Sequence, residues 1–220
     1  MNEKLLIIKT ADGSQTIKRI DIDEHYHSVN GALQESLHVF IDNGFRHISG
    51  NKISIFEVGF GTGLNAMLTF IEAEKSNKIV DYTAIELYPV NEEIFTQLRY
   101  AEMLNINSNK YFLPLHTCEW NKSVKLSDNF IFTKLNIDLI KYNDNKLFDL
   151  IYFDAFSSEK QCELWTKSVF EKMFAILNTG GVLVTYSAKG EVKRNLRDSG
   201  FTVKRLSGIN GKRHILRATK

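Results

Sequence analysis

The stretch at residues 53–65, ISIFEVGFGTGLN, constrains the fold of this chain more than any other feature of its sequence. An apolar run ends in the acid Glu57, and Gly59, Gly61 and Gly63 follow at alternating positions before a helical pattern begins. Glycines let the backbone turn tightly and let a ligand come close, because they carry no Cβ, and the first N–H groups of a helix have no intrahelical partner. The pattern predicts a first strand that turns into a first helix, with a ligand at the carboxyl end of the strand, as in open α/β sheets.

The spacing of the glycines distinguishes between classes of ligand. The dinucleotide fingerprint requires G-x-G-x-x-G, whereas this chain has G-x-G-x-G, with Leu64 where the last glycine should be. Glu57 would also lie near the position of a pyrophosphate. Both features disfavour NAD and FAD and favour a ligand with a cationic end, such as S-adenosylmethionine (SAM), which carries an ammonium and a sulfonium. The motif resembles the SAM loop of class I methyltransferases, and a tight turn without a ligand is the other interpretation it allows.

The bulk composition predicts one globular domain over residues 1–220. Of the 220 residues, 43% are hydrophobic and 25% are charged, which are ordinary values for a chain with a sizeable core. No apolar run reaches transmembrane length and the first residues lack a signal-peptide pattern, so we expect a soluble, cytoplasmic protein that does not contact a membrane. We expect neither a disulfide framework nor a metal site, because no metal-binding spacing connects the cysteines Cys118 and Cys162 or the histidines His25, His27, His38 and His47.

The charge of the chain is concentrated at one end. From Lys189 onward there are ten Lys and Arg residues against two acids, a net charge of +8, which leaves −6 on the first 188 residues of a chain whose total is +2. A basic segment of this kind indicates either a polyanionic partner on one face or an ordinary solvated surface.

Hydrophobic periodicity predicts a doubly wound α/β fold, Rossmann-like, with a seven-stranded, mostly parallel sheet. Residues 4–10 and 16–22 flank an Asp-Gly turn and predict a β-hairpin, and residues 25–41 predict a helix, so residues 1–50 form an N-terminal extension. The further predicted elements are a helix after Leu64, a strand at 81–87, a helix at 91–104, a strand within 130–140, a strand at 148–156, a helix at 166–178 capped by Thr166 and ended by Gly180-Gly181, a strand at 182–187, a helix at 190–199, and an antiparallel pair at 202–207 and 214–219.

Acids follow several of these strands. Glu86 ends the second strand about 20 residues past the glycine loop, where a ribose-binding carboxylate is expected for either SAM or NAD. Asp138 follows the third strand, where it can accept a hydrogen bond from an adenine amino group or be a plain loop acid. Asp154 ends the apolar run FDLIYFDAF, which is typical of a central strand buried on both faces. All three should lie at the same edge of the sheet as Gly59.

Several stretches together resemble one family, the methyltransferase half of the bifunctional tRNA wobble-uridine enzyme MnmC and its free-standing relatives. They run in the family's order through most of the chain, apart from residues 102–147, and are YHSVNGALQESLHVFI, FEVGFGTGLNAMLTF, YFDAF, LWTKSVFEKM, GGVLVTYSAKGEVKRNLRDSGF and GKRHILRA. The family's FAD-dependent oxidase domain is absent from the sequence, so the chain looks like the free-standing form. After DAF, the family's A-P-x-x-x-P loop is replaced by residues 157–162, SSEKQC, which lack both prolines and so free the backbone there.

The resemblance implies SAM-dependent methylation of the exocyclic amine of 5-aminomethyl-2-thiouridine at the tRNA wobble position, giving the 5-methylaminomethyl base. It implies that Asp154 is catalytic and faces both cofactor and amine. The residues that would bind SAM are Glu57, Gly59, Gly61, Gly63, Glu86 and Asp138. Those that would close over the site are Tyr26, Ser28 and Glu35. The basic residues that would hold the phosphates of the tRNA anticodon loop are Lys189, Lys193, Arg194, Arg197, Lys212 and Arg213.

Three other functions share parts of this pattern. A methyltransferase for a small molecule would keep the glycine loop and Glu86 but would not need the basic segment. An aminopropyltransferase of the spermidine-synthase type has a related fold and uses decarboxylated SAM. A catalytically inactive RNA-binding domain would bind tRNA but not SAM. The proton acceptor is also open, because a plain Asp with its low pKa is a poor base at neutral pH.

Overall fold

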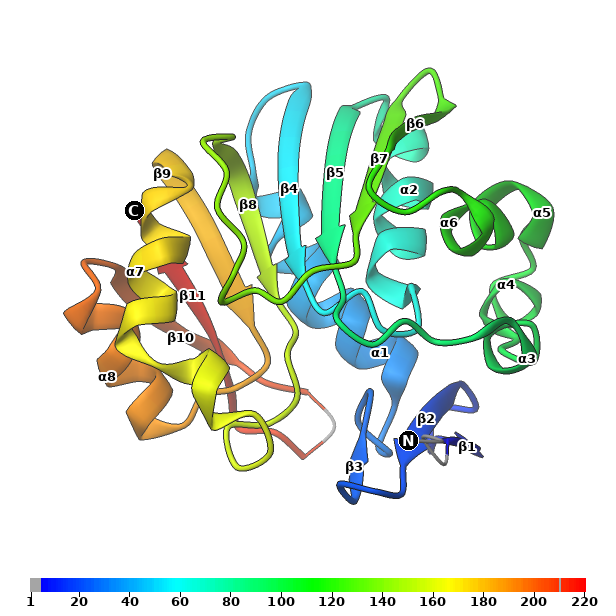
Figure 1. Ribbon diagram of the computed structural model, residues 1–220, viewed down its shortest axis with the longest axis horizontal. Coiled ribbons are helices and arrows are strands. Elements are labelled where there is room, and N and C mark those ends of the chain that lie inside the picture. The colour runs from blue at the N-terminus through cyan, green and yellow to red at the C-terminus, as the bar shows by residue number, and fades with distance from the viewer. Residues whose placement is uncertain (1–4, 210) are drawn as a thin grey trace.

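The computed structural model describes residues 5–209 and 211–220, and its centre is an eight-stranded sheet between two layers of helices (Figure 1). Four pairings are parallel, namely β9 with β8, β8 with β4, β4 with β5 and β5 with β7, and the outer pairings are antiparallel. The strands, in order across the sheet, are β10 (Thr202–Ser207), β11 (His214–Thr219), β9 (Leu177–Thr185), β8 (Phe148–Phe153), β4 (Lys52–Val58), β5 (Ile79–Ile85), β7 (Phe130–Leu135) and β6 (Ser123–Ser127).

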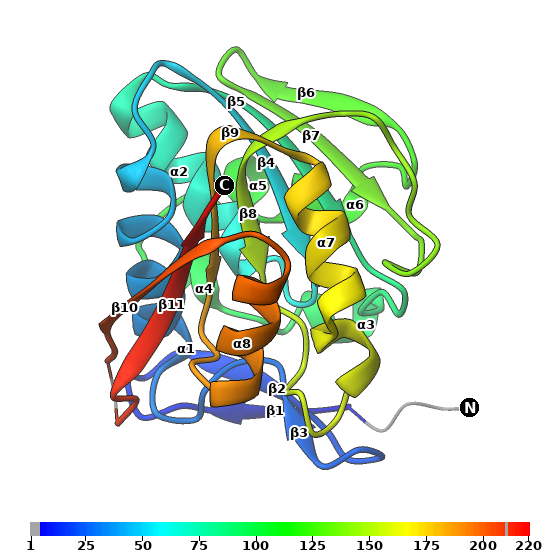
Figure 2. The ribbon, with the colours of Figure 1, turned by 90° about the vertical axis from the view of Figure 1, so that its left-hand side faces the viewer.

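Side chains alternate along each strand, so the core is divided into two layers. On β4, Ile53 and Ile55 face helix α2 (Leu64–Ser76), whereas Phe56 and Val58 face helices α7 (Lys167–Ala175) and α8 (Gly190–Asp198). Helix α1 (Ala32–Ser36) and the π-helix η1 (Leu37–Asp42) lie on the α2 side (Figure 2). The central strands are therefore buried on both faces, as their continuous apolar runs predict.

Short helices complete the α2 side between β5 and β6. They are α3 (Glu92–Phe95), α4 (Tyr100–Met103), α5 (Ser108–Tyr111) and α6 (Leu113–Thr117). Two short 3-10 turns, η2 (Phe45–His47) and η3 (Cys162–Trp165), precede β4 and α7.

The N-terminal extension forms a separate small sheet. Strands β1 (Leu5–Lys9) and β2 (Gln15–Arg19) pair antiparallel as predicted, and Asp12 stabilises their turn by accepting the Ser14 N–H at 3.0 Å. A third strand, β3 (Glu24–His25), pairs with β2 and was not predicted. This sheet lies below the carboxyl ends of the central strands (Figure 1), so it stands over the edge where a ligand is expected.

The fold class is confirmed, with one strand more than the predicted seven. The additional strand is β6, a short, half-polar segment that pairs antiparallel with β7 in the region where the sequence was least legible. The helix predicted at 25–41 begins only at Ala32, because residues 24–25 pair with β2 instead. The helix predicted at 91–104 is divided into α3 and α4.

The glycine pair Gly180-Gly181 has a different role from the one predicted. Helix α7 begins after its Thr166 cap as expected, but it ends at Ala175, and both glycines lie inside β9. The register between β8 and β9 shifts at this point, and Gly180 has a positive φ of 78°, so the pair forms an irregularity in a strand rather than a helix end.

Gly59 and Gly180 give a matched test of close packing at the glycine loop. Both have positive φ, but a Cβ on Gly59 would lie 2.6 Å from the backbone oxygen of Asp154, whereas a Cβ on Gly180 would meet nothing within 4 Å. We expect Gly180→Ala to lower the free energy of unfolding by about 1–2 kcal/mol, from backbone strain alone. Gly59→Ala should cost about 1–3 kcal/mol more, because it also overpacks β4 against β8. Urea unfolding followed by circular dichroism measures both, and equal losses would contradict the packing argument.

Candidate active site

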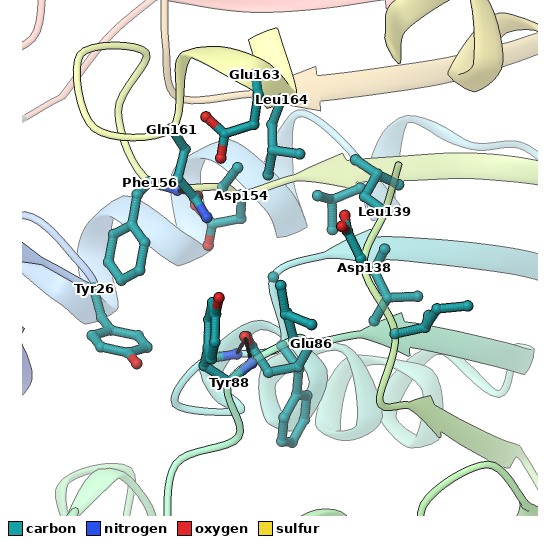
Figure 3. Close-up of a pocket in the computed structure, with 18 of the residues that line it drawn as sticks. Tyr26, Glu86, Tyr88, Asp138, Leu139, Asp154, Phe156, Gln161, Glu163 and Leu164 are labelled. Carbon is teal, nitrogen blue, oxygen red and sulfur yellow. Dashed lines mark hydrogen bonds between the residues drawn. The ribbon is translucent and has the colours of Figure 1, made fainter. Parts of the chain in front are cut away.

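A cavity of about 280 Å³ opens at the carboxyl ends of β4, β5 and β8 (Figure 3). Its walls come from the glycine loop, the segment after β5, residues 137–140 after β7, the segment after β8, and the N-terminal extension. Of the residues predicted from sequence, those that line it are Tyr26, Gly59, Gly61, Glu86, Asp138 and Asp154. The topology thus brings together acids that are far apart in the chain.

Glu86 holds the glycine loop in place. One of its carboxylate oxygens accepts the Gly61 N–H at 3.0 Å and the other accepts the Tyr88 N–H at 2.9 Å. The ring of Tyr26 packs against Gly61 so closely that a Cβ there would lie 3.0 Å from it. The loop is therefore clamped between the end of β5 and the N-terminal extension.

Two residues predicted to bind the cofactor lie behind the loop and outside the cavity lining of the described chain. Glu57 is fully buried on the α2 side of β4. Gly63 lies against His116, and a Cβ on it would sit 2.8 Å from the His116 Nε2. The structure accounts for both through the packing of the loop on α2, so any effect they have on a ligand is transmitted by the loop.

Asn65, which the sequence analysis missed, connects the buried acids. Its side-chain amide donates to Asp154 at 2.7 Å and to Glu57 at 3.1 Å. Both acids point to the α2 side, because Glu57 pairs with Tyr152 in the β4–β8 register and Asp154 lies two residues further on. Within the described part of the chain, Glu57 Oε2 and Asn65 Oδ1 have no hydrogen-bond partner. The only sequence signal for Asn65 is its place in the first turn after the glycine loop.

Burial changes the acidity of both carboxyl groups. The pKa of Asp154 is raised to about 7, chiefly by burial and also by the nearby Glu35 charge, whereas the Asn65 hydrogen bond and the Lys212 charge oppose the rise. Burial also raises the pKa of Glu57 well above its usual range. The expectation of a plain Asp with a low pKa is therefore wrong for Asp154, which can accept a proton near neutral pH.

The far wall of the cavity is mostly apolar. Ile137, Leu139 and Ile140 line it together with Leu164, which approaches from the opposite side (Figure 3). Asp138 lies among them, and its Oδ1 accepts the Ile140 N–H at 2.9 Å. A flat apolar ligand with one polar edge suits this end of the cavity.

Aromatic and basic side chains of the N-terminal extension, and of the segments after β5 and β8, form a roof over the cavity. The Tyr26 and Phe156 rings meet edge to face with centroids 4.9 Å apart. The Arg19 guanidinium lies 5.6 Å from the centroid of Tyr88 and 5.9 Å from that of Phe156. Of the other two residues predicted to close over the site, Ser28 donates its N–H to Glu35 at 3.3 Å, and both lie beside the cavity rather than in its lining among the described residues.

Side chains fix the loop after Asp154, although it lacks the two prolines of the family. Tyr186 donates to the Ala155 oxygen at 2.9 Å and Trp165 donates to the Phe156 oxygen at 2.7 Å. Gln161 accepts the Phe156 N–H at 2.9 Å, and Ser157 donates to Glu24 on β3 at 2.5 Å. The loop therefore has a defined shape and is connected to the N-terminal extension.

The predicted basic residues have different surroundings. Lys193 on α8 is close enough to Arg197 on α8 and Arg205 on β10 for their charges, together with burial, to lower its pKa. Lys189 pairs with Glu159, and Arg194 and Arg213 are exposed. Lys212 instead pairs with Glu35 beside Asp154. The α8 group is thus the part that fits a contact with a polyanion.

Among residues 5–209 and 211–220, no group of three or more His, Cys, Asp or Glu side chains is arranged to hold a metal ion. In that part of the chain there is also no helix long and apolar enough to cross a membrane.

Comparisons with known proteins agree with this geometry. The chain is 29% identical over 226 residues to "tRNA 5-methylaminomethyl-2-thiouridine biosynthesis bifunctional protein MnmC" of Pseudoalteromonas translucida, with 90% of this chain and 34% of that protein covered. It therefore spans about a third of the length of this curated relative. The crystal structure of MNMC2 from Aquifex aeolicus matches with a TM-score of 0.79 and 28% identity, covering 99% of this chain and 70% of that one.

A more distant structure shows the fold alone. Spermidine synthase from Thermotoga maritima matches with a TM-score of 0.53 and 12% identity, covering 100% of this chain and 72% of that one. The sequence model of the family described as S-adenosyl-L-methionine-dependent methyltransferase matches residues 86–220, more than half of the chain. This chain is therefore a member of that family of S-adenosyl-L-methionine-dependent methyltransferases.

Proposed function

We propose that this protein methylates the exocyclic amine of a 5-aminomethyluridine, with or without the 2-thio group, at the wobble position of tRNA. The product is the 5-methylaminomethyl base. The observation that carries the proposal is Asp154, a carboxyl with a pKa of about 7 at the wall of the cofactor cavity. The similarity to MnmC and MNMC2, the first of which is named for 5-methylaminomethyl-2-thiouridine biosynthesis in tRNA, supports the choice of acceptor.

The cavity fits the cofactor of the family. Its lining holds four acids, Glu86, Asp138, Asp154 and Glu163, against Arg19 and the half-buried His27, whose pKa is lowered to about 4, chiefly by desolvation. This balance suits a ligand with a cationic ammonium and sulfonium. Glu86 lines the cavity, and we expect its carboxylate to accept hydrogen bonds from the ribose hydroxyls in addition to those from the Gly61 and Tyr88 N–H groups. Asp138 and its apolar neighbours would hold the adenine.

The protein must deprotonate the acceptor amine and orient its nitrogen toward the methyl group of SAM. SAM supplies a methyl group on a sulfonium sulfur, and transfer is an in-line displacement that needs a lone pair on the amine. An alkylammonium has no lone pair, so the site must remove one proton and hold the nitrogen at about 3–3.5 Å from the methyl carbon. Asp154 attracts the ammonium by charge and then accepts its proton, which its raised pKa allows near neutral pH.

The acceptor base must leave its stack to reach the cavity. Bases of single-stranded loops can be splayed outward at modest cost, and the anticodon loop is single-stranded. The α8 group of Lys193 and Arg197, with Arg205, would contact the phosphates of the RNA.

The direct test of this function is nucleoside mass spectrometry. The purified protein is incubated with SAM and tRNA that carries 5-aminomethyl-2-thiouridine, and a mass gain of one methyl at that nucleoside is expected. The same protein is offered free alkylamines in parallel. Methylation of a free amine without methylation of tRNA would establish a small-molecule methyltransferase instead.

The first prediction concerns cofactor affinity. Glu86→Ala removes the acceptor for the ribose hydroxyls and the clamp on Gly61, so we expect SAM binding to weaken by about 1.5–3 kcal/mol. Calorimetric titration measures the affinity, and a circular dichroism spectrum controls for folding. A folded variant with unchanged affinity would remove Glu86 from the cofactor site.

The second prediction concerns the proton acceptor. Asp154→Asn keeps the shape of the side chain but cannot take a proton, so kcat/KM should fall about 10²–10⁴-fold while SAM affinity changes little. In the wild type, the rate should rise with pH through about 7 as Asp154 loses its proton. Near wild-type turnover by the variant at neutral pH would exclude this role.

Asp154→Asn should also change how the stability of the protein depends on pH. The folded pKa of Asp154 lies above its unfolded value, so the folded state binds more protons between about pH 4 and pH 7. The contribution of this carboxyl to stability is therefore lost as pH rises through 7. Asp154→Asn should be more stable than the wild type at pH 8, which separates loss of activity from loss of fold.

The third prediction concerns RNA binding. The logarithm of tRNA affinity should fall by roughly 0.7 per log unit of salt for each single-strand phosphate that is neutralised. Replacing Lys193 and Arg197 together by Gln should flatten this slope and raise the KM for tRNA, without changing SAM affinity. A salt-insensitive affinity in the wild type would show that the α8 group is ordinary surface.

A further inference from the structure

A second charged cluster lies on the α1 side of Asp154, outside the cavity lining formed by the described residues. Its members are Glu35 on α1, Tyr186 just after β9, and Lys212 between β10 and β11. The Lys212 ammonium pairs with the Glu35 carboxylate and lies 4.3 Å from the centroid of the Tyr186 ring. The Glu35 side chain is 9% exposed and that of Lys212 is 33% exposed. The carboxylate is thus fixed in the protein, whereas the lysine is partly in solvent.

The register of the sheet places this cluster directly beside Asp154. Tyr152 pairs with Val184 between the parallel strands β8 and β9, so Asp154 and Tyr186, each two residues further on, lie level and on the same face. The Tyr186 hydroxyl donates to the Ala155 oxygen at 2.9 Å, which fixes the ring. The charges of Glu35 and Lys212 both act on Asp154. Asp154 therefore borders both the cofactor cavity and the cluster.

The cluster has the chemistry of an alkylammonium receptor. A carboxylate and an aromatic face around one point attract a cationic nitrogen, through charge-assisted hydrogen bonding and through the ring quadrupole. The Ser28 N–H donates to Glu35 at 3.3 Å and orients the carboxylate. Lys212 is itself an alkylammonium, so the structure shows this receptor filled by a side chain of the same class as the acceptor.

We propose that Glu35 and Tyr186 form the subsite for the acceptor amine, that Lys212 occupies this subsite in the free protein, and that the ammonium of the acceptor displaces it. The inference rests on the proposed function in that the acceptor is an alkylamine. Two ammonium groups repel each other at one carboxylate, so they bind in turn. The displaced lysine returns to solvent at little cost, because ion pairs of partly exposed residues contribute little to stability.

This assignment reverses the sign of an expected mutational effect. If Lys212 held a phosphate, its removal would weaken tRNA binding and flatten the salt dependence. If Lys212 competes with the amine, its removal strengthens amine binding. The two roles therefore predict opposite changes for one substitution.

The test is a titration of the full-length, ¹⁵N-labelled protein with n-butylammonium chloride, followed by the amide signals of Ala155 and Tyr186. Lys212→Met should bind the probe about two- to fivefold more tightly, the range for a partly exposed ion pair. Glu35→Gln should bind it at least about tenfold more weakly, because a charge-assisted hydrogen bond is lost. Lys204→Met removes an exposed cation of the same basic segment on β10 and should leave probe binding unchanged.

A second pair of variants tests the same subsite at Tyr186, in case Glu35→Gln does not fold. Tyr186→Phe keeps the ring and should retain probe binding, whereas Tyr186→Leu removes the ring face and should weaken it. Unchanged probe binding in Lys212→Met, together with weaker and less salt-dependent tRNA binding, would overturn the proposal and return Lys212 to a phosphate contact. Probe binding that does not depend on Glu35 would also overturn it.

The titration uses neither SAM nor tRNA, so it is independent of the proposed function. If the probe binds as expected but aminomethyl-tRNA is not methylated, the subsite stands and the acceptor is another alkylamine. If the tRNA is methylated but binding of the probe does not depend on Glu35 and Tyr186, the proposed subsite is wrong and the proposed function stands.

Discussion

Two carboxyl groups, the fully buried Glu57 and the half-buried Asp154, share the side-chain amide of Asn65 as a hydrogen-bond donor. The arrangement is costly, because burying an ionisable group such as Glu57 with an unpaired oxygen opposes folding. The parallel pairing of β4 with β8 imposes it, since side-chain alternation directs both acids to the α2 side of the sheet. The same burial has a chemical consequence, because it raises the pKa of Asp154 into the range in which a carboxylate can accept a proton near neutral pH.

The N-terminal extension and the glycine loop act as one unit. Tyr26 packs on Gly61, and His27 is hydrogen-bonded to the Thr62 hydroxyl at 2.7 Å. The Tyr100 hydroxyl, from helix α4, donates to the Gln15 oxygen on β2 at 2.9 Å and ties the small sheet to the main domain. The same contacts that fix the glycine loop therefore also fix the roof above it.

The alternation of apolar strands with amphipathic helices sufficed to predict the fold class, because parallel strands covered by helices must be apolar on both faces. The positions of Glu86 and Asp154 followed from the same rule, since the ends of parallel strands meet at one edge. Asn65 and the pairing of Lys212 with Glu35 could not be predicted, because they depend on which face each side chain takes and on contacts between distant segments. Strand β6 and the Gly180-Gly181 irregularity were missed for a related reason, since local propensity does not determine strand register.

The loop after Asp154 contains no proline, and side-chain hydrogen bonds order it instead. Proline restricts a chain by removing conformations before folding, which is an entropic effect and varies little with temperature. Hydrogen bonds from Tyr186, Trp165 and Gln161 order the same backbone by enthalpy, so they weaken as the protein warms. We therefore expect the loop after Asp154 to lose order with rising temperature more readily than a loop held by prolines.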